Sequence, residues 1–214
     1  MRRVVILANG AIRDVEFHKK LLKESDFIIC VDGGVQLARR LGVRPGLLLG
    51  DLDSLGEDVR AWLAGGQTRC ETHPAEKDFT DTHLAVAEAI AMRPEEVLLL
   101  GCMGDRLDHT LANISLLLHC HRAGIPARLV DELNEAILIS ETVVTLRGEP
   151  GERLSLLPLS DRVSGITLEG VKYRLENETL EMGESRGVSN EFEAREAVLT
   201  VGRGYLLLIR SRGA

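Results

Sequence analysis

The sequence predicts an α/β protein in two parts: an N-terminal three-layer α/β domain with a mostly parallel sheet, then a smaller antiparallel β domain. In the first half, short apolar runs alternate with segments of helical periodicity, which is typical of βα repeats. These runs lack polar alternation, which indicates strands buried on both faces. In the second half, β-rich segments follow one another between Gly, Pro and Asn, and no convincing helix pattern remains.

The elements of the first half follow from these apolar runs and their breakers. Gly42 with Pro45, then Pro94, then Gly124 with Pro126 mark the expected helix ends. Strands are expected at residues 4–8, 27–31, 47–49, 97–100 and 127–130. Helices are expected at residues 35–41, 55–63, 80–92 and 107–123.

The second half is expected to form a small antiparallel sandwich or barrel. The change of character falls between residues 130 and 147, and we place the domains at residues 1–135 and 136–214. Strands are expected at residues 137–139, 143–146, 154–157, 165–168, 198–201 and 205–209.

The composition narrows the classes of function. The 214 residues are 44% hydrophobic and only 3% aromatic, so the core must be aliphatic. A net charge of −7 argues against a broad nucleic-acid or anionic-membrane surface. The four cysteines form no metal-binding pattern and indicate reduced thiols, and no apolar run has the length of a signal peptide or a membrane span. We therefore expect a cytoplasmic protein.

Two acids one residue apart directly follow the short strand at residues 47–49. Asp51 and Asp53 point the same way on extended backbone, so both carboxylates can meet at one point beyond the strand. A hard divalent cation such as Mg²⁺ suits oxygen ligands of this kind. The alternative is a solvated turn with Ser54 as a helix cap.

Two further polar clusters also follow strands. Asp32 and Gly33 come after the second strand, and the run GCMGDRLDH at residues 101–109 comes after the strand at 97–100. Ligands of open α/β sheets bind beyond such strand ends. A helix starting after Arg106 would offer N–H groups to a phosphate. The alternative is an ordinary helix start, with Asp108 favouring the helix dipole.

A third cluster lies at the start of the helix expected at residues 80–92. Asp78 and Asp81 are three residues apart and share a face if this segment is the first helical turn. Lys77 can contact a phosphate or remain solvated, and capping alone also explains acids and Thr80 at a helix start. The absence of a Walker loop and of a G-x-G-x-x-G motif disfavours a Walker-type NTPase and a standard dinucleotide-binding domain.

Taken together, these motifs resemble the thiamine pyrophosphokinase family in order and spacing. The likeness covers nearly the whole chain. It rests on DGG at residues 32–34, GDLDS at 50–54, KDFTD at 77–81, GDRLDH at 104–109, GITLEG at 165–170, LEN at 175–177 and SRGVSN at 185–190.

The resemblance implies transfer of the pyrophosphoryl group of ATP to the hydroxyl of thiamine, giving thiamine diphosphate and AMP. It also implies an N-terminal catalytic domain, a C-terminal thiamine-binding β-sandwich, and a homodimer with each active site between two chains. The small molecules ATP and thiamine would be the substrates, with no nucleic-acid or membrane partner.

Site roles are carried over by position. Asp105 departs from the family, where a small residue is expected, and this leaves the exact role of Arg106 open. The catalytic and Mg²⁺-binding acids would be Asp51, Asp53 and Asp81; the ATP-binding residues Asp32, Gly33, Lys77, Asp78, Thr80, Arg106 and Asp108; and the thiamine-binding residues Ser189 and Asn190.

Two other classes of function are compatible with the same residues. A Mg²⁺-dependent phosphohydrolase would use Asp51 as a nucleophile, but it leaves the β domain unexplained. A non-catalytic thiamine- or nucleotide-binding module would bind without turnover, but it does not need so many clustered carboxylates.

Overall fold

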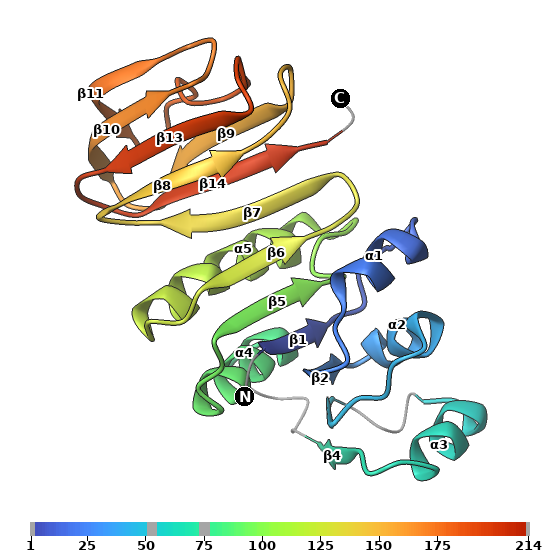
Figure 1. Cartoon of the computed structure of the whole chain (residues 1–214). Coiled ribbons are helices and arrows are strands. Elements are labelled where there is room, and N and C mark those ends of the chain that lie inside the picture. The colour runs from blue at the N-terminus through green and yellow to red at the C-terminus, as the bar shows by residue number, and fades with distance from the viewer. Residues whose placement is uncertain (1–2, 51–54, 73–77, 213–214) are drawn as a thin grey trace. The chain divides into compact units, whose positions relative to one another are not determined.

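The computed structural model describes residues 3–50, 55–72 and 78–212. The chain divides into two compact units, Met1–Glu132 and Leu133–Ala214. The first is an α/β unit and the second consists of antiparallel strands (Figure 1). The fold class predicted from the sequence is confirmed.

The first unit contains a parallel sheet. Its strands follow the spatial order β6-β5-β1-β2-β3-β4, and every neighbouring pair is parallel. The chain therefore moves outward from β1 in one direction to β2 and later returns to place β5 on the other side of β1. The strands are β1 (Arg3–Leu7), β2 (Asp26–Val31), β3 (Leu47–Leu49), β4 (Arg69–Glu71), β5 (Glu96–Leu100) and β6 (Ala127–Val130).

Helices cover both faces of this sheet. The helices are α1 (Val15–Leu21), α2 (Gly34–Leu41), α3 (Glu57–Ala64), α4 (Asp81–Ala91) and α5 (Leu107–Arg122). One hydrophobic cluster joins Val5 and Leu7 of β1 to residues of α1, α2 and α3. Val4 and Ile6 alternate with them and are fully buried on the opposite face, where α4 contacts β1. The result is the expected three-layer arrangement.

Local sequence explains where the main helices begin and end. The Thr80 hydroxyl accepts a hydrogen bond from the His83 backbone N–H at 3.2 Å, so α4 begins one residue later than its periodicity predicts. Gly42 ends α2 in the left-handed conformation at φ 75°, which glycine adopts without strain.

The second unit is a β-sandwich. Its antiparallel strands form one sheet in the order β12-β9-β14-β7 and another in the order β11-β10-β13-β8. Residues of both sheets, among them Leu156 and Leu199, share one hydrophobic cluster that also contains Phe192. The strands are β7 (Asn134–Ile139), β8 (Thr142–Arg147), β9 (Arg153–Pro158), β10 (Arg162–Glu169), β11 (Leu175–Glu181), β12 (Asn190–Glu191), β13 (Glu196–Val201) and β14 (Leu206–Ser211).

The structure adds elements that the apolar pattern did not predict. Helix α1 has only seven residues, and it begins where the Asp14 carboxylate accepts the Phe17 backbone N–H at 2.9 Å. Strand β4 has the sequence Arg-Cys-Glu and lies at the sheet edge, where a strand needs no apolar run. Cys70 in β4 is exposed, whereas the other three cysteines are buried, and all four are free thiols.

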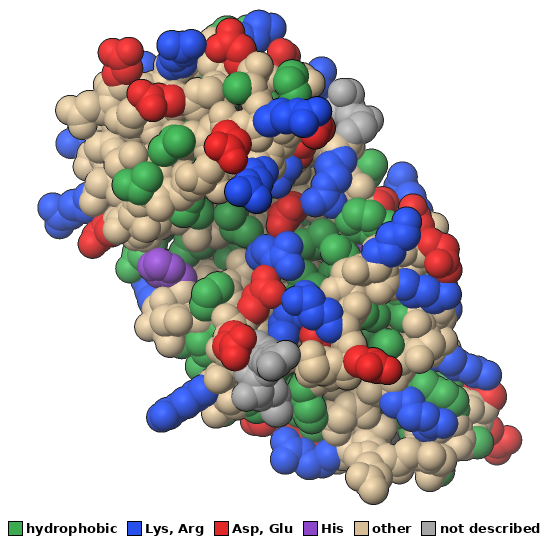
Figure 2. All heavy atoms as spheres, viewed as in Figure 1, with side chains coloured by type: hydrophobic (Ala, Val, Ile, Leu, Met, Phe, Trp, Pro, Cys, Tyr) green, Lys and Arg blue, Asp and Glu red, His purple; other side chains and the backbone are tan. Residues whose placement is uncertain are grey.

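The surface carries both signs of charge. On the face drawn in Figure 2, acidic and basic side chains are interspersed, with no large patch of one sign. Within the described ranges, no helix combines the length and apolar character needed to cross a membrane.

Candidate active site

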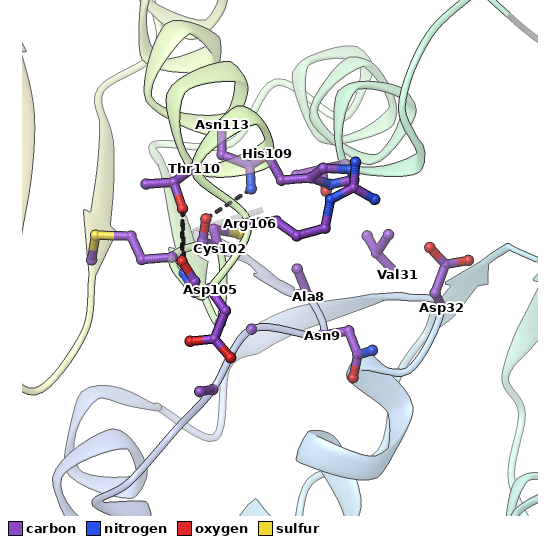
Figure 3. A pocket seen from close by; sticks show the side chains of 16 residues that line it. Ala8, Asn9, Val31, Asp32, Cys102, Asp105, Arg106, His109, Thr110 and Asn113 are labelled. Carbon is purple, nitrogen blue, oxygen red and sulfur yellow. Dashed lines mark hydrogen bonds between the residues drawn. The ribbon is translucent and has the colours of Figure 1, made fainter.

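A cavity of about 500 Å³ lies where the strand order of the parallel sheet reverses, beyond the carboxyl ends of β1 and β5. Ligands of open α/β sheets bind at this kind of switch point. The turn after β1 lines it with residues 8–11, and the turn after β5 lines it with residues 101–106 (Figure 3). Asp32, from the end of β2, and Thr82, from α4, also contribute to the wall.

Close backbone contacts hold the two turns together. The Gly10 N–H donates to the Gly101 carbonyl oxygen at 2.6 Å, and the Ala8 N–H donates to the Leu100 carbonyl oxygen at 2.9 Å. A Cβ at Gly10 would lie 2.3 Å from the Met103 carbonyl oxygen, so only glycine fits there. Glycine at this position therefore lets the two turns pack closely together at the cavity wall.

Asp32 lies at the end of β2 with φ 47°, a left-handed conformation that aspartate tolerates better than most residues. Its backbone N–H donates to the Leu49 carbonyl oxygen at 2.9 Å, which fixes it beside the end of β3. A Cβ at Gly50 would lie 2.1 Å from the Asp32 carboxylate. Because glycine has no side chain, Gly50 leaves room for that carboxylate.

Arg106 stands at the start of α5 and lines the cavity. It provides no side-chain cap for the helix and instead pairs with Asp108, Nη2 to Oδ2 at 2.6 Å. This hydrogen bond is the main reason that the pKa of Asp108 is lowered, and the same contact raises the pKa of Arg106. Both side chains are mostly exposed, so a ligand can reach the guanidinium.

The structure brings some of the predicted site residues to this cavity and leaves others out. Asp32 and Arg106 line it directly. Gly33 packs against the Asn9 side chain, since a Cβ there would lie 2.4 Å from the Asn9 Oδ1. Asp108 does not line the cavity itself but pairs with Arg106, which does. Asp81 is the first residue of α4, directly before the cavity residue Thr82.

Asp78 and Thr80 line a different hollow, of about 350 Å³, between α4 and α5. Phe79 in this hollow stacks on His83 with ring centroids 4.5 Å apart, and His83 lies 5.1 Å from His119. Burial, followed by the charge of His119, lowers the pKa of His83. Asp51, Asp53 and Lys77, also predicted for the site, lie outside the described residues.

The two predicted thiamine residues lie in the sandwich, and their side chains differ in environment. Asn190 is buried: its Oδ1 accepts the Tyr173 N–H at 3.0 Å, and its Nδ2 donates to the Tyr173 carbonyl oxygen at 2.7 Å. Ser189 is exposed, with φ 61°, and its backbone N–H donates to the Ser155 hydroxyl at 3.1 Å. Asn190 therefore fixes the backbone at Tyr173, whereas the Ser189 side chain faces solvent.

Sequence reasoning missed four polar residues of the cavity wall: Asn9, Thr82, Thr110 and Asn113. Asn113 is buried, and its amide donates to the Cys102 carbonyl oxygen at 2.8 Å, which ties α5 to the turn after β5. Asn9 directly follows the first apolar run, so its position at a strand end was the available signal. Nothing in the local sequence around Thr82 or Asn113 indicates that either faces a ligand.

A parallel sheet with a glycine-walled cavity at its switch point, an arginine at a helix start and a separate β-sandwich are the parts of an α/β enzyme that acts on a phosphorylated substrate. Two family models match the chain: "Thiamin pyrophosphokinase, catalytic domain" at residues 18–129 and "Thiamin pyrophosphokinase, vitamin B1 binding domain" at residues 141–206. The chain belongs to the thiamine pyrophosphokinase family, whose members transfer the pyrophosphoryl group of ATP to thiamine.

Individual relatives agree with this assignment. The thiamine pyrophosphokinase of Bacillus subtilis (strain 168) is 29% identical over 212 residues, which is 99% of each chain. A crystal structure of the Bacillus subtilis protein superposes with a TM-score of 0.90 at 28% identity and full coverage of both chains. The Geobacillus thermodenitrificans thiamin pyrophosphokinase gives a TM-score of 0.84 at 31% identity, covering 99% of this chain and 98% of the other.

Proposed function

We propose that the cavity at the switch point binds ATP, with the phosphates near Arg106 and the start of α5. The observation that carries this assignment is that a cavity lined by Gly10, Gly101 and Gly104 also contains an exposed guanidinium at the start of a 16-residue helix. Main-chain N–H groups, the positive end of the helix dipole and a planar cation all favour phosphate oxygens.

We assign Asp51, Asp53 and Asp81 to a Mg²⁺ site, with Asp32 in the same acidic cluster. Among the described residues, no group of three metal-binding side chains is already assembled. The carboxylate of Asp32 nevertheless lies against Gly50, the residue that precedes Asp51 in the sequence. An all-carboxylate donor set fits a hard, oxygen-seeking cation. Bound there, Mg²⁺ would neutralise negative charge on the phosphate oxygens.

In the reaction, the thiamine hydroxyl oxygen forms a bond to the β-phosphorus of ATP. The bond from that phosphorus to the oxygen bridging the α- and β-phosphates breaks, and AMP leaves with the bridging oxygen. Such transfers depend mainly on positioning and charge stabilisation. Arg106 would hold the phosphates and balance their charge, while one of the site acids or a water accepts the hydroxyl proton.

The remaining assignments concern the nucleotide, thiamine and the assembly. Lys77, Asp78, Thr80 and Asp108 remain proposed ATP contacts, although Asp78 and Thr80 line the hollow between α4 and α5 rather than the cavity. Gly33 remains a proposed ATP residue, and its lack of a side chain makes room for Asn9 at the cavity wall. Ser189 and Asn190 belong to the proposed thiamine site in the sandwich, within the segment matched by the vitamin B1 binding model. We propose a cytoplasmic homodimer, supported by the family resemblance and by four free thiols. Light scattering after size-exclusion chromatography measures the mass, and an active monomer would contradict a shared site.

Product analysis tests the proposed reaction directly. The protein is incubated with ATP, Mg²⁺ and thiamine, and the products are separated by chromatography. Equal amounts of thiamine diphosphate and AMP are expected, whereas a simple kinase would give ADP and thiamine monophosphate. Phosphate release from simple esters without thiamine would instead support a phosphohydrolase, and binding without turnover would support a binding module.

A further inference from the structure

The segment between β1 and α1, residues 8–14, forms part of the cavity wall but is held from two sides. Ala8 and Gly10 donate backbone hydrogen bonds to Leu100 and Gly101 at the end of β5. The far end of the segment is held by Glu132, whose Oε1 accepts the Arg13 backbone N–H at 3.1 Å. Glu132 follows β6 and does not line the cavity. This far contact lies outside residues 18–129, the range matched by the catalytic-domain model.

His18 lies on the same helix that this segment leads into, and it is fully buried. Its Nδ1 is 2.7 Å from the Asp14 carbonyl oxygen. A carbonyl oxygen only accepts hydrogen bonds, so Nδ1 must carry a hydrogen. The orientation of the imidazole ring is thereby fixed, with Nε2 directed at Glu132.

His18 Nε2 lies 3.8 Å from Glu132 Oε2, and both atoms are buried without a hydrogen-bond partner in the part of the chain that the structure describes. A neutral ring with hydrogen on Nδ1 has a lone pair on Nε2, and an ionised carboxylate has only lone pairs. Those two states together would place two acceptors face to face, away from water, which is unfavourable. One proton between the two atoms removes the conflict.

We infer that His18 and Glu132 share one buried proton and that Glu132, so held, is a positioning residue for the nucleotide cavity. The proton replaces the repulsion between the two atoms with attraction across 3.8 Å, the carboxyl group accepts the Arg13 N–H, and the segment at residues 8–14 is thereby held against the turn after β5. The positioning role of Glu132 rests on the proposed ATP site, whereas the shared proton does not.

Nuclear magnetic resonance tests the shared proton without any activity measurement. In protein labelled with ¹⁵N in histidine and ¹³C in glutamate, we expect either a hydrogen on both ring nitrogens of His18 or a protonated Glu132 carboxyl at neutral pH. A bare Nε2 facing an ionised Glu132 would overturn the inference, as would a hydrogen on Nε2 with none on Nδ1.

Kinetics test the positioning role. We expect E132A to raise the KM for ATP by about 5-fold or more, while kcat and the KM for thiamine change by less than about 2-fold, because only the nucleotide wall moves. E132Q keeps an acceptor for Arg13 and supplies an amide hydrogen to Nε2, so it should stay within about 2-fold of the wild type. An unchanged KM for ATP in E132A, or an E132Q variant as impaired as E132A, would contradict the role.

Glu96 provides a matched control for general destabilisation. Glu96 pairs with Arg128 at 2.6 Å at the start of β5. This is the amino end of the parallel strands, whereas the cavity lies beyond their carboxyl ends. E96A should lower the unfolding temperature without raising the KM for ATP, and equal KM changes in E96A and E132A would overturn the inference. A wild-type protein that does not bind ATP would refute the proposed function but leave the magnetic resonance result standing.

Discussion

Arg106 folds back onto Asp108, two residues further along the chain, with two hydrogen bonds: Nε to Oδ1 at 3.2 Å and Nη2 to Oδ2 at 2.6 Å. The pair occupies the first turn of α5, where a side-chain cap would usually lie. Asp108 therefore holds the guanidinium in one orientation before any ligand arrives. The same carboxylate lowers the effective charge that Arg106 presents, so the two effects oppose each other.

Replacement of either partner separates these effects. We expect R106A to reduce kcat/KM for ATP by about 100-fold, because a positive charge at the phosphates is lost, and R106K to recover little of it. D108N should raise the KM for ATP by only about 3–10-fold, since Arg106 remains charged but loses its orienting partner. Steady-state kinetics with varied ATP measure both changes.

Arg39 and Asp58 form a similar exposed ion pair, between α2 and α3. R39A and D58N are therefore matched controls that should leave kcat/KM within about 2-fold of the wild type, since exposed pairs contribute little. A D108N variant with unchanged KM for ATP would show that the orientation of Arg106 does not depend on Asp108.

Loss of one proposed metal ligand should affect turnover more than stability. We expect D53N to lower kcat by about 100-fold or more and to shift the Mg²⁺ dependence to higher concentration, because charge stabilisation is usually a large part of catalysis. The measurement is a Mg²⁺ titration of the initial rate, with D58N as the control. Near-normal turnover in D53N would remove Asp53 from the site.

The adjacent residues Ser189 and Asn190 should behave differently. N190A should raise the KM for thiamine more than that for ATP, and it should also lower the free energy of unfolding by about 1–3 kcal/mol, since Tyr173 loses two backbone hydrogen bonds. S189A removes only an exposed hydroxyl and should raise the KM for thiamine at unchanged stability. Kinetics and urea denaturation measure the two effects. Equal changes in the two KM values would contradict the thiamine assignment.

Buried thiols should make the protein sensitive to alkali. Burial raises the pKa of Cys102 and Cys120 from 9.0 to about 12. The folded state therefore keeps these protons more firmly than the unfolded chain. The stabilisation that results is complete below about pH 9 and is lost as the pH rises toward 12.

Urea denaturation at pH 8.5 and 10.5 measures this loss. In C120A the decline in the free energy of unfolding should be smaller than in the wild type by about 1–2 kcal/mol. The control is C70A, which alters the exposed thiol and should decline as the wild type does. Parallel decline in all three proteins would show that the Cys120 thiol does not contribute to the effect.

The main elements of the fold could be predicted because they depend on strong local patterns. Unbroken runs such as Leu47–Leu49 become buried parallel strands, and Gly42 ends a helix through its backbone conformation. The apolar pattern did not predict β4, because its position at the sheet edge rather than its composition makes it a strand. It also missed α1, which is too short to show a helical period and depends on the cap at Asp14.

The site was predicted only where its residues follow strands. Asp32 and Arg106 follow strands, and strand ends meet at one edge of a parallel sheet, so their position could be inferred from order alone. Thr82 and Asn113 reach the cavity from inside helices, and only the packing of α4 and α5 decides which residues of a helix face it. The family assignment was confirmed, whereas the individual site roles stay predictions.

The hydrophobic cluster beside β1 and the cluster inside the sandwich share no residue. A substitution that loosens Leu98 thus leaves every partner of Leu199 in place. Selection can therefore act on the unit matched by the catalytic-domain model and on the unit matched by the vitamin B1 binding model almost separately. One lineage could exchange its acceptor while inheriting its phosphate donor unchanged.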